Sequence, residues 1–396
     1  MFKYFLIFIS LFFIACSSRP PAPPTEHAHA LPWGALDLDP HTNAHNSVKV
    51  SLGSALRQKA YRHGDSNTTV PYNILVLSGG GSRGAFGAGL ISGWNIRGDM
   101  PKFDVITGIS TGSIMAPFIF LGGRELEKMN YFYTEKTTEE VFTNTWERFF
   151  NGGYIMNAKP LKKLFRKTFN EDFLEKVAAE HKKGRRLYVG TTNIDTGQLT
   201  VWDMGAIAAS SREDKYERFS DIIYASTAMP VYLPPQYMYV DVEDERYYQM
   251  HVDGGIYSQV FMVGFLTNWE ETLALGPDAN TNFDTTLYTI ANRKYRQRDI
   301  YKPVAQKPFA IIEAYVLTEM DLLFDRSMYR LYQNCKAKDI TFKMVAIPEK
   351  MENIVEDPTE FEPENLLKLY SLAYELGRDG IVWEEEVSLD AYDTRK

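Results

Sequence analysis

The residues with the clearest chemical meaning form a G-x-S-x-G motif centred on Ser110. Gly108 and Gly112 flank the serine, between a predicted strand at residues 103–109 and a predicted helix at residues 111–121. Glycines let the backbone turn sharply without Cβ clashes, and a helix N-terminus favours negative charge near the serine hydroxyl. A serine on such a strand-to-helix turn is typical of ester hydrolases. We therefore predict that Ser110 is the nucleophile of a serine hydrolase that acts on ester bonds.

A second motif, rich in glycine, directly follows a buried strand predicted at residues 74–77. Its glycines let backbone N–H groups approach a developing oxyanion next to the start of another helix. A dinucleotide-binding motif would need an acidic residue at the end of the second strand, whereas Asp104 lies at that strand's beginning. A P-loop is excluded because no Gly-Lys-Ser/Thr is present. The predicted oxyanion hole consists of Gly79, Gly80, Gly81, Ser82, Arg83 and Gly84. Arg83 either orients an anionic group or forms a structural ion pair.

The third motif is Asp253 with two glycines after it, at the end of a strand predicted at residues 247–252. A carboxylate at the carboxyl edge of a sheet is where α/β sites form, although Asp-Gly-Gly alone usually marks a turn. His251 lies two residues earlier, so both side chains point to one face of an extended strand. A Ser–His–Asp triad is therefore an alternative. Same-face neighbours are about 7 Å apart, however, and this chain order is unusual for a triad, so His251 is otherwise a strand residue packed beside the site.

Together these motifs resemble the patatin-like phospholipases in order and in context. A glycine-rich oxyanion loop comes first, then G-x-S-x-G, then D-G-G, and residues 225–230 are similar to the family's A-S-x-A-x-P segment. Residues 191–197 also resemble the strand pair that precedes this segment in the family. The resemblance covers about residues 72–257. It implies the fold of the cytosolic phospholipase A2 catalytic domain, an α/β fold with a mostly parallel central sheet and helices on both faces.

The resemblance further implies a lipid acyl hydrolase that cleaves membrane phospholipid or lysophospholipid with a Ser–Asp dyad. Ser110 then attacks the acyl carbonyl, Asp253 accepts its proton as general base, and N–H groups around Gly80, Gly81 and Ser82 stabilise the oxyanion. An ordinary aspartate, with a pKa of about 3.9, is a weak base at neutral pH, so we expect burial to raise the pKa of Asp253. Hydrolysis would follow through an acyl-enzyme. Transacylase and thioesterase activities remain alternatives, because they need only a different acceptor or leaving group.

Strands and helices alternate along the chain, which also favours a mostly parallel sheet that is covered on both faces. The further strands are predicted at residues 187–192, 237–242 and 340–347. The further helices are predicted at residues 85–96, 161–179, 308–332 and 364–376. No internal repeat is visible, so residues 48–396 are predicted to form one catalytic domain.

The N-terminus has the features of a bacterial lipoprotein signal. Lys3 precedes an apolar run at residues 4–15, which is too short to span a bilayer and fits a secretory signal. The sequence F-I-A-C ending at Cys16 is similar to a lipobox, although Phe stands where that motif usually has Leu. We predict a signal peptide at residues 1–15, lipidation of Cys16 and, because Ser17 rather than Asp follows, attachment to the outer membrane. A plain cleaved signal and an uncleaved anchor are the alternatives.

Pro-rich residues 16–47 are predicted to form an extended, unpacked tether. The formal net charge of −8 argues against nucleic-acid partners. Cys335 is the only cysteine besides Cys16, so no intrachain disulfide is expected once Cys16 carries lipid. No motif calls for a metal or another cofactor. The competing hypothesis is a non-catalytic envelope lipoprotein that kept the fold as a binding module.

Overall fold

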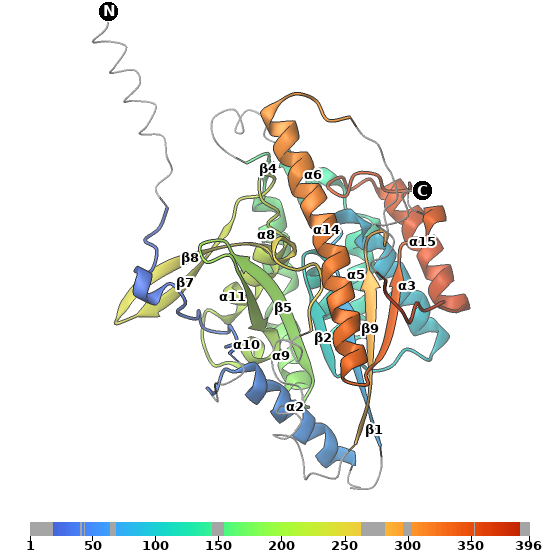
Figure 1. Ribbon diagram of the computed structural model, residues 1–396, viewed down its shortest axis with the longest axis horizontal. Helices are drawn as coiled ribbons and strands as arrows, with labels where there is room; N and C mark the ends of the chain where they lie inside the picture. Colours follow the sequence, from blue (N-terminus) through green and yellow to red (C-terminus); the bar gives the residue numbers. More distant parts are fainter. Residues whose placement is uncertain are drawn as a thin grey trace, which may run out of the picture.

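The computed structural model has a central sheet with helices packed against both faces (Figure 1). It describes residues 19–39, 42, 44–63, 69–144, 154–262, 282–295, 303–351 and 353–388. The predicted signal peptide and Cys16 lie outside these residues. The predicted α/β fold with a mostly parallel central sheet is confirmed.

The central sheet has eight strands in the described part of the chain. They are β1 (Val70–Leu77), β2 (Val105–Gly108), β5 (Arg186–Asn193), β6 (Gln198–Asp203), β7 (Gln236–Val242), β8 (Glu245–Asp253), β9 (Phe283–Ala291) and β10 (Thr341–Ala346). Their order is β10-β9-β1-β2-β5-β8-β7, with β6 paired to β5. The pairs from β10 to β5 are parallel, whereas β8 and β6 pair antiparallel with β5, and β7 pairs antiparallel with β8. A separate short pair joins β3 (Thr143–Asn144) and β4 (Met156–Asn157).

The helices divide between the two faces of this sheet. The α-helices are α2 (Val48–His63), α3 (Gly84–Arg97), α4 (Thr111–Leu121), α5 (Glu125–Thr134), α6 (Thr138–Val141), α8 (Lys159–Thr168), α9 (Glu171–Lys182), α10 (Met204–Ala209), α11 (Lys215–Thr227), α14 (Pro308–Ala337) and α15 (Pro363–Asp379). Helices α2 and α14 contribute to one hydrophobic core, and α3, α4, α5, α9, α11 and α15 contribute to the other. The helix predicted at residues 111–121 has these same bounds in the structure.

Alternate side chains of β1 supply the two cores. Leu75 and Leu77 belong to the core under α3 and α4, whereas Ile74 and Val76 belong to the core under α2 and α14. Successive side chains of a strand point to opposite faces, and here both faces are covered. This is why the strand has a continuous apolar run in the sequence rather than an alternating pattern.

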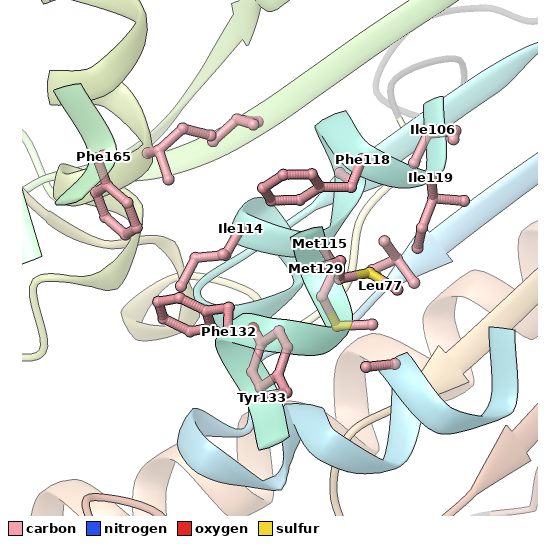
Figure 2. Packing of buried hydrophobic residues seen from close by; sticks show 14 of the residues in the cluster. Leu77, Ile106, Ile114, Met115, Phe118, Ile119, Met129, Phe132, Tyr133 and Phe165 are labelled. Carbon is pink, nitrogen blue, oxygen red and sulfur yellow. The ribbon is translucent and has the colours of Figure 1, made fainter. Parts of the chain in front are cut away.

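Helix α4 is buried on nearly every side. Figure 2 shows Ile114, Met115 and Phe118 projecting from it in different directions, with Met129 and Phe132 of α5 close by. A helix that is apolar all round belongs in the interior of a protein. The close packing holds α4 rigidly, and with it the turn that precedes the helix.

The single helix predicted at residues 161–179 is wrong. The structure has two helices, because α8 ends at Thr168 and α9 begins at Glu171. Asn170 caps the second helix, since its side-chain oxygen accepts a hydrogen bond from the Phe173 amide at 3.1 Å. Apolar residues keep helical spacing across the break, which conceals the cap in the sequence pattern.

The prediction that residues 16–47 form an unpacked tether is also wrong for the part that the structure describes. The Arg19 guanidinium binds the Asp195 carboxylate through two contacts of 2.6 Å. The Tyr248 amide donates to the Pro21 carbonyl at 2.8 Å, and Leu36 is buried. Proline favours extended backbone, but an extended segment can still pack along a neighbouring strand. The packed body therefore includes residues well before residue 48.

The C-terminal part of the chain packs into the same body as the motifs. Helices α3 and α15 cross at glycines, and a Cβ at Gly93 would lie 2.0 Å from the Tyr374 carbonyl oxygen. Strands β9 and β10 extend the sheet beside β1. The described residues from 282 onward thus belong structurally with the N-terminal strands.

We expect Gly93→Ala to destabilise the protein by about 1–3 kcal/mol, because the added methyl group collides with the backbone of α15. In a helix without this close contact, the same change would instead stabilise the protein by about 1 kcal/mol. The sign of the change in unfolding free energy therefore tests the contact. Urea unfolding measures the change. Ile96→Ala is the control, since Ile96 is exposed in the same helix and should shift stability by only about 0.5 kcal/mol. A neutral or stabilising Gly93→Ala would contradict the close crossing.

Candidate active site

Ser110 lies on a tight turn between β2 and α4. Its backbone has φ 54° and ψ −125°, a region that side chains with a Cβ rarely occupy. Gly108 and Gly112 allow this turn, because a Cβ on Gly108 would lie 2.4 Å from the Gly112 carbonyl oxygen. The strained turn presents the serine hydroxyl at the N-terminus of the buried helix α4. The structure therefore has the elbow geometry that the sequence predicts.

The Asp253 carboxylate accepts a hydrogen bond from the Ser110 hydroxyl at 2.7 Å between Oγ and Oδ2. Its other oxygen accepts from the Gly255 amide, also at 2.7 Å. Only one edge of β5 is open to both β2 and β8, because β6 occupies the opposite edge. Strand β2 pairs along that edge up to Val189, and β8 pairs along it from Thr191 onward in the opposite direction. The ends of β2 and β8 therefore face each other, which brings Ser110 and Asp253 together.

The A-S-T-A-M-P segment at residues 225–230 supports both of these residues. The Ser226 hydroxyl accepts a hydrogen bond from the Ser110 amide at 3.0 Å and donates to the Gly190 carbonyl at 2.8 Å. The Ala228 carbonyl accepts from the Asp253 amide at 3.0 Å. One short segment at the end of α11 thus holds the backbone on both sides of the Ser–Asp contact.

Burial raises the pKa of Asp253 to about 6. Loss of hydration disfavours the carboxylate, while the hydrogen bonds from Ser110 and Gly255 and the positive charge of Arg293 act in the opposite direction. A carboxylate with this pKa is a stronger base than ordinary aspartate and is still ionised at neutral pH. These properties suit proton transfer from a serine hydroxyl.

His251 is fully buried, and its ring contacts residues other than Ser110 and Asp253. Its Nδ1 contacts the Thr191 hydroxyl at 2.9 Å, and its Nε2 lies 3.4 Å from the Gln249 side-chain oxygen. Burial, with help from the Arg218 charge, lowers the pKa of His251 to about 3. Both ring nitrogens of His251 thus contact side chains other than those of Ser110 and Asp253. The alternative of a Ser–His–Asp triad does not agree with this geometry, and His251 is a packed strand residue.

The glycine-rich loop lies directly against the serine. A Cβ at Gly79 would lie 3.1 Å from the Ser110 Cβ. Gly81 has φ 58° and approaches the Pro358 carbonyl oxygen so closely that a Cβ would lie 2.1 Å from it. The amides of Gly80 and Gly81 donate to no acceptor in the described part of the chain. They therefore remain available to an oxyanion, and the amide of Gly79, which was also predicted to contribute, likewise has no acceptor among the described residues.

The inclusion of Ser82 among the oxyanion donors needs correction. Its amide donates to the Pro358 carbonyl at 2.9 Å. The Arg83 amide likewise donates to Gly80, and the Gly84 amide donates back into the same turn. The Ser82 amide is therefore already bonded to Pro358, which lies 276 positions later in the chain. Local sequence cannot reveal such a distant partner.

Arg83 lines the pocket and also contacts the C-terminal loop. Its guanidinium donates to the Val355 carbonyl at 3.0 Å and to the Glu356 carbonyl at 2.6 Å. The structure thus gives this arginine a role in holding the C-terminal loop over the glycine-rich turn.

Two residues at the end of β9 contribute to the site without a signal in the sequence. The Asn292 side chain donates to the Ser78 carbonyl at 3.1 Å and accepts from the Gly87 amide at 3.1 Å, so it ties the glycine-rich segment to β9. Arg293 pairs with Asp321 and donates to the Met320 carbonyl at 3.2 Å. Burial, together with repulsion from Arg83, lowers the pKa of Arg293 to about 10. No motif marks these residues, and β9 itself was not predicted.

An apolar pocket opens beside the Ser–Asp contact. Ser110 and Asp253 lie in its wall together with Gly80, Gly81 and Gln259. Its apolar lining consists of Ile114, Phe132, Val141, Phe142, Met156, Leu161, Met229, Leu233, Leu317, Met320 and Phe361. A long hydrocarbon chain suits such a lining. Across the described residues, no group of His, Cys, Asp and Glu side chains is arranged to hold a metal ion.

Comparison with known proteins identifies a family. Residues 75–265 match the family described as patatin-like phospholipase. Patatin-12 and patatin group J-1 from Solanum tuberosum are each 23% identical over 205 residues, which cover 46% of this chain and 49% of the relative. The chain thus spans about half the length of the curated relatives it matches. The crystal structure of VipD from Legionella pneumophila is similar with a TM-score of 0.34 and 13% identity, over 78% of this chain and 67% of that chain.

The predicted resemblance to the patatin-like phospholipases is therefore confirmed. The match to the patatin-like phospholipase family covers residues 75–265. This range contains the glycine-rich loop, Ser110 and Asp253. Asn292, Arg293 and the pocket residues of α14 lie beyond it.

We expect Asp253→Asn to reduce kcat/KM for a soluble ester by at least about 100-fold, because an amide cannot accept the serine proton. His251→Gln should retain most activity, since His251 does not contact the dyad. In the unchanged protein kcat/KM should rise with pH through about 6, because below this pKa Asp253 is protonated. Loss of turnover in His251→Gln alone, with a normal folded spectrum, would overturn the assignment of Asp253 as the base.

Proposed function

We propose that the protein is a serine hydrolase that cleaves acyl ester bonds of lipids. The hydrogen bond from Ser110 to the buried Asp253, at the wall of an apolar pocket, is the observation that carries this proposal. The patatin-like domain supports the same class of reaction. Intact dyad geometry is difficult to reconcile with the competing hypothesis of a non-catalytic binding module.

The reaction begins when the Ser110 Oγ attacks the acyl carbonyl carbon and its proton moves to Asp253. The carbonyl oxygen becomes an oxyanion in the tetrahedral intermediate. Collapse of this intermediate breaks the ester bond, and the leaving alcohol takes the proton from Asp253. Water then attacks the acyl-enzyme, with Asp253 again accepting the proton, and the second collapse returns the proton to Ser110 and releases the fatty acid.

The amides of Gly80 and Gly81 are the proposed oxyanion donors. Each such donor is typically worth about 3 kcal/mol in the transition state. The positive end of α4 adds to this field at the serine. Asn292 and Pro358 hold the loop in place, so the donors need little reorganisation during the reaction.

The proposed substrate is a membrane phospholipid or lysophospholipid. The apolar lining accommodates the acyl chain. Arg83 and Arg293 both line the pocket, and their mutual repulsion contributes to the lowered pKa of Arg293. Positive charge at the pocket wall would attract a substrate phosphate, which favours a phospholipid over an uncharged ester.

We expect a fluorophosphonate probe to label the unchanged protein and to leave Ser110→Ala unlabelled, because the probe reacts only with an activated serine. Mass spectrometry of lipid products from both proteins tests the substrate class, and released fatty acid with lysophospholipid is the expected result. Ser113→Ala is the matched control: this serine lies in the first turn of α4 and its hydroxyl donates to the Ser110 carbonyl at 2.6 Å, so the variant should still be labelled at Ser110. A folded, unreactive wild-type protein would support the binding module instead.

We further propose that Cys16 is lipidated and holds the protein in the bacterial envelope, at the outer membrane. The F-I-A-C sequence and the apolar run before it support this proposal. An anchor of this kind would keep the enzyme beside its substrate, which its net charge of −8 would not do at an anionic membrane.

Metabolic labelling with palmitate tests the anchor. We expect label in the unchanged protein and in Cys335→Ala but not in Cys16→Ala, because Cys335 is buried and Cys16 is the acceptor. Cys16→Ala should also move into the soluble fraction. Unlabelled wild-type protein, or full membrane retention of Cys16→Ala, would refute lipidation as the main anchor.

A further inference from the structure

The N-terminal half of α14 exposes a cluster of apolar side chains. Ile311, Ile312 and Tyr315 are 52%, 50% and 64% exposed, and none of them belongs to either hydrophobic core. Among the described side chains of α14, Phe324 is the first that is buried. Figure 1 shows the corresponding half of the helix extending past the carboxyl end of β9. Single exposed apolar residues are common, but a cluster on one helical segment indicates a contact surface.

This segment, residues 308–318, is called the α14 tip. Its other side forms part of the wall of the active-site pocket. Leu317 lines the pocket and is itself 37% exposed, and Met320 lines the pocket one turn later. Glu313 accepts a hydrogen bond from the Tyr232 hydroxyl, which also lies in the pocket wall. The exposed apolar surface is therefore continuous with the pocket that receives the acyl chain.

The charge of the α14 tip indicates which kind of partner it suits. From residue 303 to residue 318 the only charged residues are Lys307 and Glu313, and Glu313 is engaged with Tyr232. The segment thus has no cluster of cations for an anionic surface and no cluster of anions for a basic one. Isoleucine and tyrosine suit the boundary between lipid headgroups and acyl chains.

We propose that the α14 tip inserts into the interface of a bilayer of zwitterionic phospholipid and brings the pocket mouth to the membrane. The choice of lipid as the partner rests on the proposed function. An acyl chain must leave the bilayer to reach Ser110, and contact by the α14 tip gives it a continuous apolar path. The contact is peripheral, since no helix in the described part of the chain is long and apolar enough to span a membrane.

Hydrogen exchange of the full chain tests the contact without requiring turnover. The protein carries Ser110→Ala, so that the phosphatidylcholine vesicles stay intact. We expect amides of residues 308–318 to exchange more slowly with vesicles than without them, with little change when salt is raised. Amides of α15 should be unaffected and serve as the internal reference. Unchanged exchange in the α14 tip overturns the proposal, as does protection that depends on protein concentration without vesicles, which would indicate a second copy of the chain.

Substitution separates membrane contact from catalysis. We expect the triple variant Ile311→Gln, Ile312→Gln and Tyr315→Gln to lose at least about tenfold in hydrolysis of vesicle phospholipid, because it removes three apolar side chains that the bilayer would bury. Hydrolysis of a soluble short-chain ester should stay near the unchanged value. An equal rate on vesicles, or an equal loss on both substrates in a protein of unchanged thermal stability, overturns the proposal.

The matched control changes three apolar residues that are at least as exposed and do not line the pocket: Ile96→Gln, Leu367→Gln and Val382→Gln. These residues are 65%, 52% and 81% exposed, and this variant should retain both activities. A comparable loss on vesicles in the control would assign the effect to general surface polarity and overturn the specific role of α14. Protection of the α14 tip without any lipid hydrolysis would refute the proposed function but not the membrane contact. Lipid hydrolysis without protection of the α14 tip would refute the membrane contact but not the proposed function.

Discussion

The active site depends on one constraint of the sheet, the shared edge of β5. Strand β6 occupies the opposite edge, so β2 and β8 must follow each other along the same line of backbone hydrogen bonds. Gly190 lies at the change from parallel to antiparallel pairing, and its carbonyl accepts the Ser226 hydroxyl. The end of β2 supplies Ser110 and the end of β8 supplies Asp253. Two residues separated by 143 positions thus meet at 2.7 Å.

Burial at this junction has opposite consequences for two titratable residues of β8, Asp253 and His251. It raises the pKa of Asp253, which makes the carboxylate a more effective base, and it lowers the pKa of His251, which keeps the imidazole neutral. In both cases the cause is the loss of hydration of the charged form. In the proposed dyad, the basicity of Asp253 therefore comes from its burial at the strand end and requires no third side chain. Arg293 opposes the effect of burial on Asp253, because its positive charge favours the carboxylate and lowers the pKa of Asp253.

The part of the chain beyond the patatin-like match completes the site. Strand β9 pairs with the full length of β1, and this places Asn292 against the glycine-rich loop. The Pro358 carbonyl accepts a hydrogen bond from the Ser82 amide, and α14 forms one wall of the pocket. The proposed catalytic motifs are thus local, but the loop conformation and the pocket depend on residues that are distant in sequence.

The sequence by itself determined the elbow at Ser110, the glycine-rich loop, the aspartate at Asp253 and the α/β class. These features follow from local requirements, because sharp turns need glycine and doubly covered strands need apolar runs. Most strands and helices could be predicted for the same reason, whereas the break at Asn170 was hidden by continuous helical spacing. Only the tertiary structure decided that His251 contacts Thr191 and Gln249 rather than Ser110, that the Ser82 amide is already bonded to Pro358 and that residues 19–38 contact the rest of the protein. Each of these outcomes depends on which distant groups meet across the sheet, and hydrogen-bond partners that lie far apart in the chain leave no pattern within one segment.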